Sequence, residues 1–94
     1  SYASDRGLDR IRAKALYESS RVLKRRKRFS EDDLLNFLTQ SVDADSTYAP
    51  PHRDLCDILQ QKDKRTAKRH CEAYLRAAPN GVYAQQVREL LRNL

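Results

Sequence analysis

The stretch from Tyr48 to Pro79 constrains the fold most, because it predicts two short helices joined by a polar turn. Pro50 and Pro51 suit the first turn of a helix, where a backbone N–H has no partner inside the helix. The next apolar residues recur at helical spacing, and Asp63 is in place to cap a second helix, which we expect to end at Pro79-Asn80-Gly81. The apolar faces consist of Leu55, Cys56, Ile58 and Leu59 in the first helix and Ala67, Cys71, Tyr74, Leu75 and Ala78 in the second.

Composition favours an all-α fold. The 94 residues suit one domain, glycine occurs only twice, and good helix formers dominate over strand formers. No apolar run approaches the ~20 residues of a membrane span, and no signal-peptide pattern is visible. We therefore expect no membrane span. A cytoplasmic location is favoured, and a periplasmic or other envelope location remains open.

Two further helices are expected upstream of this stretch, over residues 7–27 and 30–42, after a frayed segment at 1–6. Ser30 is a candidate N-cap, because three acidic residues follow it and suit the positive end of a helix dipole. A turn-rich string at 43–47 ends the second of these helices. Their apolar positions are Leu8, Ile11, Ala15, Leu16, Val22 and Leu23 in the first, and Leu34, Leu35, Phe37, Leu38 and Val42 in the second.

The two helical pairs look like copies of one unit, with Leu34-x3-Leu38 aligned on Ala67-x3-Cys71. A last amphipathic helix over 81–93, with Val82 or Tyr83, Val87, Leu90, Leu91 and Leu94 as its apolar residues, would cover the final apolar face. The expected organisation is one domain over 1–94, with repeats at 7–47 and 48–80 and a capping helix at 81–94.

The pattern of these units resembles the tetratricopeptide repeat (TPR) family over roughly residues 13–94. That family has x2-L-G-x2-Y in its first helix, A-x3-F in its second and a proline after it. The second unit has His52-x2-Leu55-Cys56-x2-Leu59, Ala67-x3-Cys71 and Pro79, and the first has Leu16-x2-Ser19-Ser20-x2-Leu23, Leu34-x3-Leu38 and Ser46. The chain departs from the pattern at the small glycine, replaced by Ser20 and Cys56, and at the proline of the first repeat.

The resemblance implies a right-handed superhelix whose first helices line a groove that binds peptides. Such a groove would be mostly basic here and would suit an acidic or amphipathic segment, because arginine can hold a carboxylate with two hydrogen bonds. The implied function is non-catalytic protein–protein interaction within a larger regulatory or assembly protein. The groove positions implied are Tyr17, Arg21, Lys24, Arg25, Arg53, Asp57, Gln60 and Gln61.

The alternative function is nucleic-acid binding through the basic run Lys24 to Arg28, in a chain of net charge +6. Exposed cations of this kind contact phosphates without reading sequence. The simplest explanation of the run is a solvated helix end, where cations suit the dipole. Self-association is a further option for the partner.

Enzymatic chemistry has little support in the sequence. His52, Cys56, His70 and Cys71 are zinc-ligand types, but His70 and Cys71 are adjacent and point about 100° apart on a helix. We therefore expect no metal, no cofactor and no catalytic residue, with surface histidines and cysteines packed as small apolar thiols. A Cys56–Cys71 disulfide is the less favoured alternative and would need an oxidising compartment.

Overall fold

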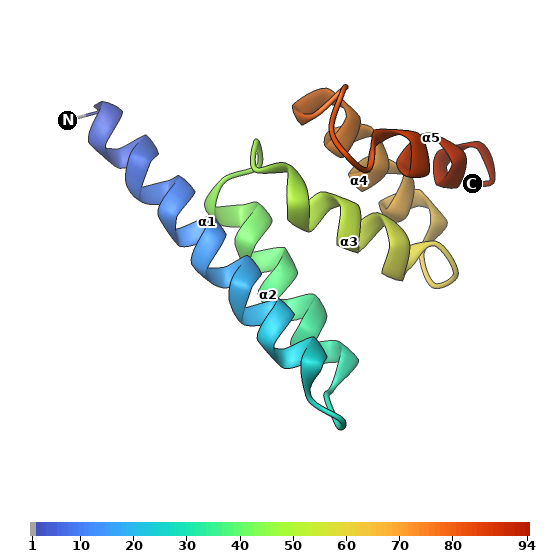
Figure 1. Ribbon diagram of the computed structural model, residues 1–94, viewed down its shortest axis with the longest axis horizontal. Helices are drawn as coiled ribbons and strands as arrows, with labels where there is room; N and C mark the ends of the chain where they lie inside the picture. The colour runs from blue at the N-terminus through green and yellow to red at the C-terminus, as the bar shows by residue number, and fades with distance from the viewer. Residues whose placement is uncertain (1) are drawn as a thin grey trace. The chain divides into compact units, whose positions relative to one another are not determined.

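The computed structural model describes the backbone of residues 2–94 and the side chains from residue 6 onward. Within these residues the chain forms five helices and no strand, which confirms the all-α prediction (Figure 1). Two compact units, Ser1–Tyr48 and Ala49–Leu94, divide the chain and are described separately. The first contains α1 (Tyr2–Arg25) and α2 (Glu31–Ala44), and the second contains α3 (Ala49–Leu59), α4 (Lys64–Ala77) and α5 (Ala84–Arg92).

Local capping signals place two helix starts where the sequence predicts them. The amide of Asp33 donates to the Ser30 side chain over 3.3 Å, and the amide of Thr66 donates to Asp63 over 3.1 Å. Pro50 follows the first residue of α3, as its fixed φ and missing N–H favour. Both caps and the proline start are therefore confirmed.

Other boundaries differ from the prediction. α1 begins at Tyr2 instead of residue 7 and ends at Arg25, because no proline or other stop signal precedes Gly7. The predicted fraying of residues 1–6 therefore falls on a segment that is helical from Tyr2 onward. α2 continues to Ala44, past the predicted end at 42, because the amide of Asp45 still donates to Ser41 O over 3.1 Å.

The first unit is a helical hairpin in which α1 and α2 lie side by side (Figure 1). Small side chains at the interface let the helices approach closely, and Ser41 Oγ donates to the backbone carbonyl of Ala13 over 2.7 Å. The buried residues are Ala13, Tyr17 and Ser20 from α1 and Leu34, Leu38 and Ser41 from α2.

The second unit has its core at a disulfide between Cys56 of α3 and Cys71 of α4, whose Cα atoms are 5.1 Å apart. The expectation of two free thiols is therefore wrong. The cysteines lie on the helix faces that meet, so packing the α3–α4 pair brings the sulfurs together. Both are buried in a cluster with Tyr74, Ala84 and Val87.

The turn between α4 and α5 shifts the start of the last helix from residue 81 to Ala84. Gly81 approaches Tyr74 so closely that a Cβ there would lie 2.7 Å from the phenol oxygen. The same phenol accepts a hydrogen bond from the amide of Tyr83 over 3.3 Å. The prediction offered Val82 or Tyr83 as the first apolar residue of this helix, but both precede it and are 92% and 43% exposed. Ala84 lies in the core instead.

Candidate binding surface

The four predicted groove residues on α1 do not share one environment. Tyr17 is only 7% exposed, and its ring meets Tyr48 edge to face with centroids 6.1 Å apart. Arg21 is exposed, with Nη1 3.9 Å from a carboxylate oxygen of Glu18. Lys24 and Arg25 are exposed in the last turn of α1. Tyr17 therefore has little surface to offer a ligand, whereas the cations have much.

Three of the four predicted groove residues in the second unit make contacts within that unit. The Arg53 guanidinium lies 3.9 Å from the ring centroid of Tyr83, and Gln60 donates to Asp57 over 2.9 Å. α3 ends at Leu59, so Gln60 and Gln61 lie in the turn after the helix. The prediction that all four lie on a first helix is thus wrong for these two. A groove formed jointly with the α1 residues stays a prediction.

The surface that α1 does expose is an apolar stripe. Leu8, Ile11 and Val22 are 57%, 65% and 50% exposed, and Ala15 lies between them at helical spacing. We call these four residues the α1 stripe. It faces away from the side of α1 that carries Ala13 and Ser20 against α2. The apolar residues that recur at helical spacing from Leu8 to Val22 therefore lie on the solvent-exposed face of α1.

A shallow groove continues from the stripe toward α2. The short side chains of Ala15 and Ser19 leave room along α1, and Phe37 supplies an apolar wall from α2. Ala15 and Val22 belong both to the stripe and to the groove. The groove is lined by Ala15, Glu18, Ser19, Val22, Leu23, Arg26 and Phe37.

Cations surround this apolar surface. Helical spacing places Lys14 and Arg25 on one side of the α1 stripe and Arg12 on the other, and all three are exposed. Arg26 lines the end of the groove, and Glu18 is the one acidic residue in its lining. The five side chains from Lys24 to Arg28 are all exposed. The surface therefore combines apolar contact area with a positive border.

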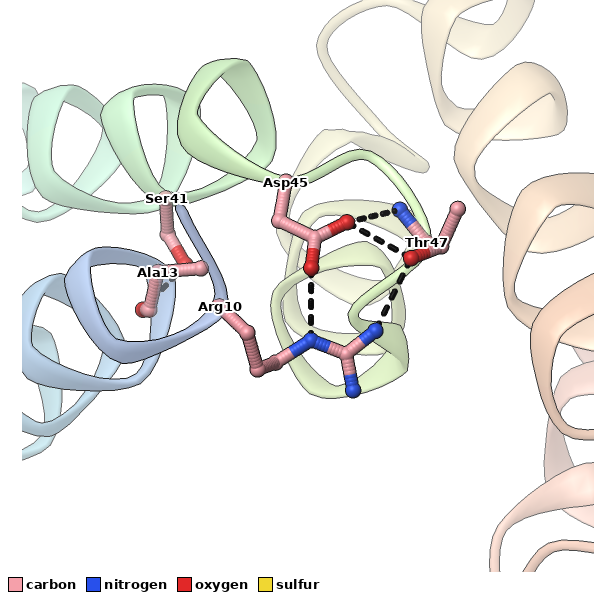
Figure 2. A network of polar contacts seen from close by, with 5 residues as sticks. All are labelled: Arg10, Ala13, Ser41, Asp45 and Thr47. Carbon is pink, nitrogen blue, oxygen red and sulfur yellow. Dashed lines mark hydrogen bonds and ion pairs between the residues drawn. The ribbon is translucent and has the colours of Figure 1, made fainter. Parts of the chain in front are cut away.

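A polar network at the other end of the hairpin ties the loop after α2 to α1 (Figure 2). Arg10 Nε donates to Asp45 over 2.6 Å and its Nη2 donates to Thr47 over 2.8 Å, while the Thr47 hydroxyl donates to Asp45 over 2.6 Å. Partial burial raises the pKa of Asp45, but the hydrogen bonds from Thr47 and Arg10 outweigh it and leave the pKa below its usual value. Because Arg10 also lies 5.3 Å from the ring centroid of Tyr48, we interpret this network as a structural clasp.

Two histidines meet inside the second unit, which corrects the expectation that both lie on the surface. His52 of α3 is 4% exposed, and its Nδ1 lies 3.0 Å from Nδ1 of His70 on α4. Burial, and after it the charge of His52, lowers the pKa of His70 to about 4. In the described part of the chain, no group of three or more His, Cys, Asp or Glu side chains is placed to hold a metal ion.

No family model, curated protein sequence or solved structure matches this chain. No helix among the described residues is long and apolar enough to cross a membrane.

Proposed function

We propose that this chain is a non-catalytic protein–protein interaction module that binds its partner through the α1 stripe and the adjoining groove. The observation that carries this proposal is the exposure of Leu8, Ile11 and Val22 in a row on one helix. Apolar side chains exposed singly are ordinary on a protein surface, whereas several on one face of a helix, bordered by charges, are typical of an interaction site.

Physical reasoning supports a binding role for this row. Burying apolar surface stabilises a complex by roughly 25 cal/mol per Å² before the costs of association are counted. The stripe and groove offer that area on a helix that α2 already holds in place, so little ordering is needed on this side of the interface. The resemblance to TPR domains, which serve as scaffolds for protein binding, favours the same class of function.

The proposed surface differs from the groove expected from the repeat pattern. It lies within one hairpin and uses the face of α1 that carries Ile11 and Val22, while Tyr17 is buried. The cations Arg21, Lys24 and Arg25 belong to the same helix and add positive potential around the site. We propose that the hairpins are TPR-like and that the module belongs to a larger regulatory or assembly protein.

The disulfide favours an oxidising compartment for the protein over the cytoplasm. Cys56 and Cys71 are joined and buried in the core of their unit, and structural disulfides persist where thiols are not kept reduced. We therefore propose a periplasmic, extracellular or other oxidising location. Thiol trapping of the protein taken directly from its source, followed by mass measurement, checks this, and two free thiols would contradict it.

Cross-linking with lysate from the source cell, with and without nuclease treatment, tests the proposed function. The protein is compared with Ile11→Asp/Val22→Asp, which places two carboxylates in the stripe. The control, Asn36→Asp/Thr39→Asp, adds the same two negative charges at exposed positions of α2. We expect a protein that cross-links to the wild type and the α2 control and is lost, by tenfold or more, from the stripe variant. Equal cross-linking to all three overturns the proposal, and capture that disappears with nuclease treatment favours the nucleic-acid alternative.

A further inference from the structure

The geometry points to a specific class of partner for this surface: an amphipathic helix whose apolar face is flanked by acidic side chains. This inference rests on the proposed function and names the chemistry of its ligand. The shape of the surface and its charges both favour such a helix over a membrane surface or a second copy of the chain.

The shape of the surface suits a helix. Leu8 and Val22 are separated by about 21 Å along α1, which equals roughly four helical turns. The surface dips at Ala15 and Ser19 and rises at Phe37 on α2, so it forms a shallow trough instead of a flat face. A helix of similar length can place apolar side chains at i, i+3, i+4 and i+7 along such a trough.

The cations around the α1 stripe determine which side chains can flank the apolar face of the partner helix. Lys14 and Arg25 border one side of the stripe and Arg12 the other, while Arg26 lies at the groove end. Arg12 Nη1 lies 3.8 Å from a carboxylate oxygen of Asp9, so the positive charge is concentrated on the side of Lys14 and Arg25. Acidic residues beside the partner's apolar face would meet these cations, and basic ones would be repelled. The one acidic group in the lining, Glu18, already lies 3.9 Å from Arg21, so its charge is partly offset.

Two other occupants fit the surface less well. A membrane-surface helix needs a broad apolar face, whereas this stripe has three large apolar residues and a concave neighbour. A second copy docking stripe to stripe would bring Lys14, Arg12 and Arg25 of both chains together, and that like-charge contact opposes self-association.

Fluorescence anisotropy with two synthetic helical peptides tests the inference. Both carry the same leucine stripe at helical spacing on an alanine background, one with glutamates and the other with lysines on the flanking positions. We expect the glutamate peptide to bind the full chain at least tenfold more tightly than the lysine peptide. Ile11→Asp/Val22→Asp should weaken this binding at least tenfold, and Asn36→Asp/Thr39→Asp should leave it within twofold. Circular dichroism establishes that each variant is folded.

A charge variant keeps the test decisive even if the stripe variant fails to fold. Arg12→Gln/Arg25→Gln changes only exposed side chains and should weaken the glutamate peptide about three- to tenfold while leaving the lysine peptide unchanged or slightly tighter. Equal affinity for the two peptides, or binding that neither variant affects, overturns the inference. Stripe-dependent binding to vesicles containing phosphatidylserine, or stripe-dependent dimers in sedimentation, without a preference for the glutamate peptide, overturns it in favour of a membrane or a second copy.

The two proposals fail in distinguishable ways. If a cellular protein cross-links through the stripe but the peptides show no charge preference, the interaction function stands and the acidic-helix inference falls. If no protein depends on the stripe for cross-linking, the proposed function itself falls, whatever the peptides do.

Discussion

His52 and His70 form an imidazole pair whose protonation is limited by geometry. Their Nδ1 atoms are 3.0 Å apart, so one nitrogen donates and the other accepts when both rings are neutral. A proton on each ring would place two cations in contact beside a buried disulfide cluster. The pair therefore favours the neutral state, and the lowered pKa of His70 follows from burial and then from this neighbour.

Stability of the protein should decrease as the pH falls from about 6.5 toward 4. The pKa of His70 is about 4 when folded and 6.5 ordinarily, so the unfolded chain binds more protons within that window. Its contribution is fully present above pH 6.5 and is lost on acidification. Because His70 is only partly buried, we expect a discounted loss of about 1 kcal/mol between pH 7 and pH 5.

Urea unfolding at pH 7 and pH 5 measures this loss, with His70→Gln as the comparison. The variant should lose less stability than the wild type over the same interval. Asp45 and Asp63 have lowered pKa values, so their effects appear below the usual carboxyl range, outside this window. An identical pH dependence in both proteins would contradict the assignment to His70.

The helices of the second unit are held together by more than packing. The Cys56–Cys71 bond joins α3 to α4 across a sequence separation of 15 residues, and α5 adds Ala84 and Val87 to the same cluster. Removing the bond leaves the apolar cluster in place but frees the unfolded chain from a closed loop. The disulfide is thus a stabilising constraint on an already defined helix pair.

Replacing both cysteines should lower the free energy of unfolding. For Cys56→Ala/Cys71→Ala we expect a loss of about 2–4 kcal/mol, since a loop of this length contributes roughly that much through the entropy of the unfolded chain. Thermal melts with and without a phosphine reductant provide the measurement. The reductant should destabilise the wild type and leave the double variant unchanged. If the melting temperature of the wild type is unchanged after complete reduction, as verified by mass, the disulfide does not have this role.

α1 carries two distinct faces, one packed against α2 and one exposed. Ala13 and Ser20 form a small-residue face that packs against α2, while Ile11 and Val22 lie exposed on the other side. The close contact of small residues is fixed by the hydrogen bond from Ser41 to Ala13. This arrangement leaves Leu8, Ile11 and Val22 exposed to solvent.

On the scale of the whole molecule, the net charge of +6 attracts any polyanion, so binding to nucleic acid needs a separate test. The five exposed cations from Lys24 to Arg28 could contact at most about five phosphates, which gives a loss of affinity for duplex DNA of roughly 10²–10³-fold between 50 and 200 mM salt. We expect their replacement by glutamine to abolish this weak, sequence-blind binding and to leave the fold intact.

Filter binding of unrelated duplexes measures this effect. The matched control replaces five other exposed cations by glutamine, at Lys62, Lys64, Arg65, Lys68 and Arg69. If charge alone drives binding, both variants lose affinity to a similar extent. Selective loss in the Lys24–Arg28 variant, together with discrimination between duplex sequences, would favour a dedicated nucleic-acid site over the protein-interaction function.

The all-α class and several helix boundaries could be predicted from the sequence, because they depend on neighbours in the chain. Ser30 and Asp63 cap the helices that follow them through amides three residues ahead, and Pro50 suits the start of α3. Helical spacing also located the apolar positions. Such signals act within one turn of helix, so they can be recognised without knowledge of the fold.

Which of those positions are buried, and which distant residues meet, depends on how the helices pack. This packing exposes Ile11 and buries Tyr17, and it brings Arg10 to Asp45 and His52 to His70. Periodicity shows that a helix has an apolar face, but a helix packed through small residues can present that face to a partner instead. The physical reason is that these contacts join residues on different helices, and their formation depends on how closely the backbones approach, which spacing along the chain does not encode.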